Sequence, residues 1–434
     1  MGNCASGNAV VIGECDSKDP NKGSIRVYCR ARPLSFSELE RNYVSVLNSP
    51  DGRTITVDCP NGTQEFQFDK VYMESATQEE IFKDTEDLIQ SAVDGFNVCI
   101  FATGTSRSGK SFTLLGDPAG EFEGIVPRAC NRIFELEEKL RSKFTISVSV
   151  YMIDIYYGKL VDLLSMTSGQ DRKQLKVKKD ENGMVFIEGI EMVNVQDAEG
   201  LFTLIYAGKQ NRYSFSTMMN SVSYSGHLII GIMIESTCKE TGQVLKGKLS
   251  IVDLASRYPM QHVTDGTQNL VREMMLINSS LAALDEVVVA LAKGTFVPYR
   301  NNVLTHLLQD CLGGNAKTLL FTNISPSDFE QEDTIRALLF ASKFKMITRE
   351  VSKNVVIKKE EEKKDGRKEK ETKKEEKEKE KKEDEEKKED RMEDETKTEE
   401  EKEKGKEKEE EGEKELEEKN KEGSEEKENV KNTE

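Results

Sequence analysis

The chain has 434 residues, of which 36% are hydrophobic and 33% are charged, and its formal net charge is −17. This acidic balance argues against a nucleic-acid partner, and the sequence has neither a secretory signal nor an apolar run of the ~18 residues that span a membrane. The charge is unevenly distributed, because residues 358–434 contain 26 Lys and Arg against 36 Asp and Glu, a net charge of −10 that leaves −7 for residues 1–357. Only the first part is apolar enough to bury a substantial core. The eight cysteines form no C-x-x-C pair, so we expect single thiols in a reducing cytosol.

Residues 1–22 are small and polar and are predicted to form a flexible leader. The first six residues, MGNCAS, match the pattern for myristoylation of Gly2, and Cys4 is available for palmitoylation. One acyl chain binds a membrane only marginally, so an anchor here needs both residues. Membrane association through acylation and a chance match of a short pattern both remain open at this stage.

The elements that follow alternate between strands and helices. The β-branched and apolar runs predict strands at residues 24–34, 54–59, 66–72, 97–103, 144–157, 227–236 and 247–255. Apolar residues at three-to-four spacing predict helical segments at 76–95 and 267–294, each of which ends at a glycine. Strands that alternate with long helices favour a three-layer α/β domain around a central sheet.

The sequence GTSRSGKS at residues 104–111 matches the phosphate-loop pattern G-x-x-x-x-G-K-[ST]. It lies between the buried-strand pattern VCIFAT and the helical pattern KSFTLL, which is the context that this motif requires. Glycines let the backbone wrap around an anion, and the lysine of the pattern reaches the β- and γ-phosphates while the serine takes a place on Mg²⁺. The predicted contacts to ATP or ADP are Gly104, Thr105, Ser106, Arg107, Ser108, Gly109, Lys110, Ser111 and Phe112.

The run LSIVDLA is an apolar strand pattern that ends in Asp253. Phosphate-loop proteins use an aspartate in this position to hold Mg²⁺ through water. An apolar strand ending in Asp is common by itself, but its occurrence together with a phosphate loop favours a metal-binding role for Asp253. We therefore predict a metal site made of Ser111 and, through water, Asp253.

From about Ser24 to Ile347 the sequence resembles the kinesin motor domain, and most closely the C-terminal-motor, minus-end-directed kinesins. The motifs that carry the resemblance occur in the family's order: IRVYCRARPL, FDKVYMESATQEEIF, the phosphate loop, GIVPRA, IDIYYGKLVDLL, LINSSLAAL, VPYRNNVLTHLLQDCLGGNAKTLLFTNISP and TIRALLFASKFK. The resemblance implies an α/β, three-layer P-loop NTPase fold with a central, mostly parallel sheet. It also implies a microtubule-stimulated ATPase in which Arg30, Arg32 and Pro33 flank the adenine of the bound nucleotide.

Both loops that read the γ-phosphate in kinesins depart from the family pattern here. The first switch, N-x-x-S-S-R-S-H, reads NSVSYSGH, so Ser223 is kept while Tyr224 and Ser225 replace a serine near Mg²⁺ and an arginine. The second switch, D-L-A-G-S-E, reads DLASRY, so Ser256 replaces a glycine that senses the γ-phosphate and Tyr258 replaces a glutamate. The resemblance implies that this arginine and glutamate pair to close the site. Because phosphoryl transfer depends on positioned charge, we expect hydrolysis and motility to be weak or lost.

Microtubule binding is expected by resemblance, but weakly. Ser279, Val303 and His306 stand where kinesins usually have a basic residue, while Lys293, Arg300 and Lys317 remain. A net charge of −7 over residues 1–357 gives no long-range attraction to an acidic filament.

The expected organisation is a leader at 1–22, a kinesin-like motor domain at 23–350 and a Lys/Glu-rich tail at 351–434. The tail has no apolar heptads, so we expect a disordered segment or a single helix and a monomeric protein in the cytoplasm and on microtubules. Two alternatives remain open. One is a nucleotide-independent interaction or scaffold module on a kinesin fold. The other is an active motor in which Arg107 or Arg257 supplies the missing positive charge.

Overall fold

The computed structural model describes residues 22–117, 121–165, 174–181, 183–218, 226–257, 268–350, 352 and 354–356. The chain divides into two units, 1–358 and 359–434, and all described residues belong to the first. Several predicted features lie outside the described residues: Gly2 and Cys4 of the leader, Ser223, Tyr224 and Ser225 of the first switch, Tyr258 of the second switch, and nearly all of the tail.

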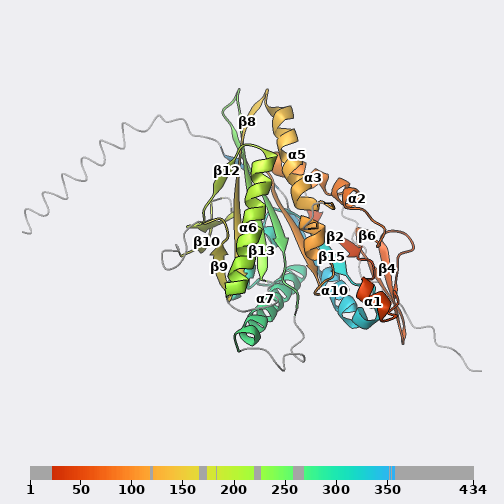
Figure 1. Cartoon of the computed structure of the whole chain (residues 1–434). Coiled ribbons are helices and arrows are strands. Elements are labelled where there is room, and N and C mark those ends of the chain that lie inside the picture. The colour runs from red at the N-terminus through yellow and green to blue at the C-terminus, as the bar shows by residue number, and fades with distance from the viewer. Residues whose placement is uncertain are drawn as a thin grey trace, which may run out of the picture. The chain divides into compact units, whose positions relative to one another are not determined.

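A mixed β-sheet forms the centre of the described unit (Figure 1). Its strands lie in the order β12 (Val193–Val195), β8 (Phe144–Tyr156), β13 (His227–Cys238), β14 (Val244–Asp253), β7 (Asn97–Gly104), β15 (Lys317–Ile324), β2 (Arg26–Ala31) and β6 (Lys70–Tyr72). The pairings from β14 to β6 are parallel, and those from β12 to β14 are antiparallel. The parallel half places the carboxyl ends of its strands at one edge of the sheet, where ligands bind in open α/β folds.

Helices cover both faces of this sheet and complete the three layers (Figure 1). One face packs on α3 (Glu86–Val93), α5 (Ile125–Leu140) and α6 (Ala198–Met218), and the other on α7 (Gln268–Lys293), α8 (Val303–Leu307) and α10 (Gln331–Phe344). Strand β7 shows why both faces need covering, because its apolar side chains alternate between the two faces of the sheet. Val98 and Ile100 belong to the core with α3, α5 and α6, whereas Cys99 and Phe101 belong to the core with α7, α8 and α10. The predicted three-layer α/β fold is confirmed.

The remaining elements are short and lie around the sheet. The helices are α1 (Phe36–Glu40), α2 (Gln78–Lys83), α4 (Lys110–Leu115), α9 (Gln309–Leu312), η3 (Tyr299–Asn301) and η4 (Asp328–Glu330). The strands are β9 (Lys159–Asp162) beside β8, the sheet of β3 (Leu47–Asn48), β4 (Thr54–Cys59) and β5 (Gly62–Gln67), the pair β10 (Lys176–Lys179) and β11 (Val185–Glu188), and the pair β1 (Lys22–Ser24) and β16 (Thr348–Glu350).

The helical segment predicted at 76–95 is divided into α2 and α3. Asp84 ends α2, and its carboxylate accepts hydrogen bonds from Lys70 and from the Tyr72 hydroxyl, the latter at 2.6 Å. These contacts tie the break between the helices to strand β6. A periodic pattern does not show such a break because its cause lies elsewhere in the chain.

The folded unit continues beyond residue 350. The Asn354 N–H donates to the Gly95 carbonyl at 2.9 Å, and the Lys246 N–H donates to the Asn354 carbonyl at 3.0 Å. Strand β17 (Val355–Val356) then pairs antiparallel with the start of β14. The segment after α10 therefore packs against the sheet before it reaches the charged tail.

Helix α7 contains a segment, Val271–Lys293, that is long and apolar enough to cross a membrane by composition. In this fold Leu284, Val287 and Val288 of that segment are buried in the core between α7 and the sheet. This packing accounts for the part of its apolar character that lies on the buried face, and 33% of the apolar window is buried.

A buried ion pair joins the sheet to α9. The Lys248 ammonium donates to the Asp310 carboxylate at 2.8 Å, and both side chains are almost completely buried. Asp310 also accepts hydrogen bonds from the Val185 N–H and the Asn97 amide. Burial alone would lower the pKa of Lys248, but Asp310, Tyr151 and Cys311 together more than offset this and leave the pKa above its usual value.

Candidate nucleotide-binding site

The predicted phosphate loop connects β7 to α4 at the carboxyl edge of the parallel strands. Gly104 has φ 143°, and a Cβ there would lie 2.0 Å from the Asn323 carbonyl oxygen and 2.6 Å from the Ser108 hydroxyl. Gly109, immediately before α4, has φ 96°. Only glycine adopts both conformations readily, so the two fixed glycines of the motif are explained by the backbone path.

Arg107 is unusual within this loop because it adopts φ 60° without being a glycine. A residue with a side chain rarely takes this conformation, and strain of this kind is concentrated at functional sites. The Arg107 side chain is exposed. It is therefore free to approach a ligand from the solvent side of the loop.

Lys110 is held inside the loop by acceptors of its own chain. Its ammonium donates to the carbonyl oxygens of Gly104 at 3.2 Å and Thr105 at 2.8 Å, and to the Ser256 hydroxyl at 2.6 Å. Only 8% of Lys110 is exposed, and this burial lowers its pKa to about 8 although Asp253 acts in the opposite direction. The lysine is thus fixed where a phosphate-loop lysine meets its ligand.

Ser111 and Asp253, the two residues predicted to hold a metal, lie against each other. Strands β7 and β14 are parallel with Asp253 opposite Ala102, so the aspartate ends its strand beside the loop. The Ser111 hydroxyl donates to the Asp253 carboxylate at 2.5 Å. A hydroxyl and a carboxylate are hard oxygen ligands of the kind that Mg²⁺ prefers, so these residues fit a Mg²⁺–phosphate group.

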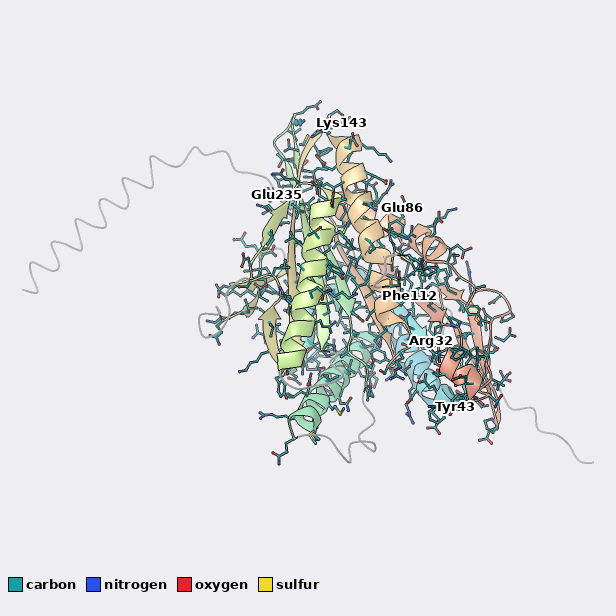
Figure 2. All side chains as sticks on the ribbon, in the orientation of Figure 1. Arg32, Tyr43, Glu86, Phe112, Lys143 and Glu235 are labelled. Atoms are coloured by element: carbon teal, nitrogen blue, oxygen red, sulfur yellow. The ribbon has the colours of Figure 1, made fainter. Side chains whose placement is uncertain are left out.

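A cavity of about 280 Å³ adjoins the second half of the loop. Its walls include Arg30, Arg32, Pro33, Ser108, Gly109 and Phe112, which were predicted from the sequence, together with Gln78, Phe122 and Asn323. Two of these wall residues, Arg32 and Phe112, are labelled in Figure 2. The predicted adenine residues and the phosphate loop are thus brought together in one hollow.

The arginines of this cavity are fixed by protein partners. Arg30 donates to Gln78 and to the Thr113 hydroxyl, both at 2.8 Å, and its guanidinium lies 5.2 Å from the centre of the Phe112 ring. Arg32 binds both carboxylate oxygens of Glu38, at 2.7 and 2.6 Å, and this bond is the main reason why the pKa of Glu38 is lowered to about 2. Both arginines therefore shape the cavity wall through contacts that they already make.

Phe122 is a cavity residue that the sequence did not reveal. Its ring is 55% exposed and lies 6.2 Å from the 37%-exposed ring of Phe112, so two apolar faces border the opening. Exposed aromatic rings are suited to stacking on a flat heterocycle. No motif marks Phe122, because it reaches the cavity from the loop that follows α4.

A larger cavity of about 500 Å³ adjoins the first half of the loop. It lies beside Thr103–Ser106 and is bordered by Ala255 and Arg257 of the second switch and by residues of α7 and α10. Arg257 is exposed and borders this larger cavity, not the smaller one. Arg107, the other arginine considered as a source of compensating charge, lines neither of these two cavities.

His227 connects the end of the first switch to the second switch and to α7. The Ala255 N–H donates to His227 Nδ1 at 3.1 Å, so the proton is on Nε2, which lies 2.6 Å from the Ser280 hydroxyl. Ser280 in turn donates to the Ile277 carbonyl at 2.7 Å. Burial, with a contribution from Arg212, lowers the pKa of His227 to about 3, so this link uses the neutral ring.

Comparison with known proteins identifies the family in which this arrangement of phosphate loop and switches occurs. The model of the kinesin motor domain matches residues 30–347. The chain belongs to the kinesin family. The kinesin-like protein KIN-14I of Oryza sativa subsp. japonica is 40% identical over 339 residues, which are 78% of this chain and 27% of that protein. KIN-14E of Arabidopsis thaliana is also 40% identical, over 77% of this chain and 26% of that protein.

This kinesin chain thus spans about a quarter of the length of these curated relatives. Among solved structures, a fast kinesin has a TM-score of 0.69 at 30% identity, with 78% of this chain and 96% of that chain covered. A KIF14 dimer bound to a microtubule through both heads, with AMP-PNP, has a TM-score of 0.70 at 27% identity, with 77% and 96% covered. The predicted resemblance to the C-terminal-motor kinesins is confirmed by the KIN-14 relatives.

Three basic residues were expected to remain on the microtubule-binding side of this kinesin. Lys293 and Arg300 are exposed. Lys317 instead donates to the Ser91 hydroxyl at 2.9 Å and lies 4.0 Å from the centre of the Phe96 ring, so its ammonium already has partners within the fold. Burial, with Arg300 and Lys179 nearby, lowers the pKa of His306, which therefore adds little positive charge at neutral pH.

Proposed function

We propose that this chain binds Mg·ATP or Mg·ADP in the hollow around the phosphate loop, docks weakly on microtubules and hydrolyses ATP slowly or not at all. The observation that carries the nucleotide proposal is the contact of Ser111 with Asp253 beside the buried Lys110. These groups belong to separate parts of the sequence and meet where the motif requires them. Kinesins bind nucleotide with Mg²⁺, which supplies charge neutralisation at the phosphates.

The chain's own residues would act by holding and orienting the nucleotide. Loop N–H groups between Gly104 and Ser111 bind the phosphates, and Lys110 neutralises the outer ones. Ser111 and Asp253 hold the metal, the latter through water, while Phe112, with Arg30, Arg32 and Pro33 in the same wall, borders the base.

Weak hydrolysis is proposed from the switches. Ser256 occupies the position of the glycine in the kinesin pattern, and its hydroxyl holds Lys110. The sequence further places Tyr224, Ser225 and Tyr258 at positions where kinesins have a serine, an arginine and a glutamate. Loss of one positioned transition-state contact typically costs about 10²–10³ in rate. Losses within one catalytic unit are not additive, but their combined effect remains large.

The binding proposal is tested by titration calorimetry of the full chain with Mg·ADP and Mg·ATP. Lys110→Ala should weaken binding about tenfold or more, because it removes a charge-assisted hydrogen bond to phosphate. Lys143→Ala, a change of an exposed lysine immediately before β8, should leave both affinities unchanged. Absence of binding by the wild type would favour the alternative of a nucleotide-independent scaffold on a kinesin fold.

The location of the protein in the cell is also a proposal with two parts, microtubules and a membrane. The family implies association with cytoplasmic microtubules, and we propose that location for this chain. Membrane attachment through acylated Gly2 and Cys4 is a further proposal from the MGNCAS pattern. Mass spectrometry of the N-terminal peptide tests it. Wild-type protein without added mass, recovered entirely in the soluble fraction, would contradict it.

A further inference from the structure

Ser256 is the second-switch residue whose side chain enters the phosphate site. It lies three positions after Asp253, is 5% exposed, and its hydroxyl is 2.6 Å from the Lys110 ammonium. The kinesin pattern has glycine at this position, which offers no side-chain acceptor. The contact between Ser256 and Lys110 is therefore a feature of this chain's own sequence.

The ammonium of Lys110 has all of its donors in use. An ammonium carries three N–H donors, and three acceptors surround it: the carbonyl oxygens of Gly104 and Thr105 and the hydroxyl of Ser256. A phosphate oxygen can take a direct hydrogen bond from Lys110 only by replacing one of them. The carbonyls belong to the loop backbone, whereas the hydroxyl belongs to the second switch.

The competition bears unequally on the phosphates of a nucleotide. In a phosphate loop the backbone N–H groups hold the α- and β-phosphates, and the lysine reaches the β- and γ-phosphates. A diphosphate keeps the N–H and Mg²⁺ contacts even when Lys110 stays with Ser256. The third phosphate of a triphosphate depends more on the lysine, so an acceptor that holds Lys110 weakens its attraction most.

We infer that Ser256 is a specificity-determining residue that biases this site toward nucleoside diphosphates over triphosphates. The inference rests on the proposed nucleotide binding, because it presupposes a ligand in the loop. Ser256 acts through Lys110, and is in this sense a positioning residue. Its effect is on the ratio of two affinities, which a general structural role would not change.

The test measures dissociation constants of Mg·ADP and Mg·AMP-PNP for the full chain and for Ser256→Ala. Removal of one hydrogen bond to a charged group should shift the ratio of the two constants about tenfold in favour of the triphosphate analogue. Ser236→Ala is the matched control, because Ser236 is likewise a buried serine with a side-chain hydrogen bond, in which its hydroxyl donates to the Val93 carbonyl. This control should leave the ratio unchanged.

The outcomes separate the two proposals. If both ligands bind the wild type and Ser256→Ala leaves their ratio unchanged, the inference is wrong and the nucleotide proposal stands. If neither ligand binds the wild type, the nucleotide proposal itself is wrong and the inference fails with it. Should Ser256→Ala not fold, Ser256→Cys replaces the hydroxyl with a thiol, which is a weaker acceptor, and carries the same comparison without introducing the glycine of the kinesin pattern.

Discussion

The buried neutral ring of His227 should make the free energy of unfolding depend on pH. The folded protein holds the ring neutral, with a pKa of about 3, whereas an unfolded histidine has a pKa of about 6.5. Below pH 6.5 the unfolded state therefore binds a proton that the folded state does not. Stability falls as the pH is lowered from about 6.5 toward 3, and is unaffected by this group above 6.5.

The size of the effect can be estimated for a change from pH 7.5 to 5.0. The lower value is about 1.5 pH units below the ordinary histidine pKa, and each unit corresponds to about 1.4 kcal/mol, so His227 should cost about 2 kcal/mol of folding free energy. Glu273 acts in the opposite direction. Burial, assisted by Asp154, raises its pKa to about 7, so protonation stabilises the fold between about pH 7 and the ordinary glutamate value.

A comparison of variants isolates His227 from such groups. Urea unfolding of the full chain, followed by circular dichroism at both pH values, should show that His227→Gln loses about 2 kcal/mol less than the wild type on acidification. Glutamine keeps a donor and an acceptor but does not titrate. His306→Gln, a change of a less buried histidine, should follow the wild type more closely. Equal pH dependence of wild type and His227→Gln would refute the assignment of a buried neutral ring.

Two further predictions concern the buried ion pair and the loop. Lys248→Met should destabilise the fold by about 3–5 kcal/mol in urea unfolding at pH 7.5, because it leaves the Asp310 carboxylate buried without its partner. The double change Lys248→Met with Asp310→Leu should recover part of this loss. A destabilisation by Lys248→Met of less than about 1 kcal/mol would contradict the reasoning. Gly104→Ala should weaken Mg·ADP binding more than about tenfold in calorimetry, because its Cβ meets the Asn323 carbonyl. Gly242→Ala, at a glycine with φ 67° and open space around it, controls for backbone strain alone, and equal effects of the two changes on binding would contradict the loop argument.

The sequence predicted those parts of the site that depend on short, contiguous motifs. Gly104, Lys110 and Ser111 lie together because a strand–loop–helix segment is local, and Asp253 meets them because parallel strands end at one edge. The apolar run VCIFAT likewise predicted a buried strand, and the side chains of β7 are buried on both faces of the sheet. Local sequence motifs and the apolar pattern of the strands were sufficient to predict these features.

Other features depend on partners that are distant in the chain. The Asn354 side chain donates to the Lys246 carbonyl 108 positions earlier, so no local pattern shows that the chain stays folded after α10. The internal partners of Lys317 and the position of Phe122 are likewise matters of tertiary packing. The contact of Ser256 with Lys110 joins two motifs that were each recognised, but their side-chain geometry was not predictable from either one.

The central claim is that the chain retains nucleotide but turns it over poorly, and phosphate release by the full chain tests it most directly. Release should be measured with saturating Mg·ATP, with and without microtubules, for the wild type and for Ser225→Arg combined with Tyr258→Glu. We predict little stimulation of the wild type, and more turnover in the double variant than the two single changes give together, because only the pair restores both charges of the switches. Wild-type turnover raised by microtubules to the rate of the double variant or above it would contradict the account and identify an active motor.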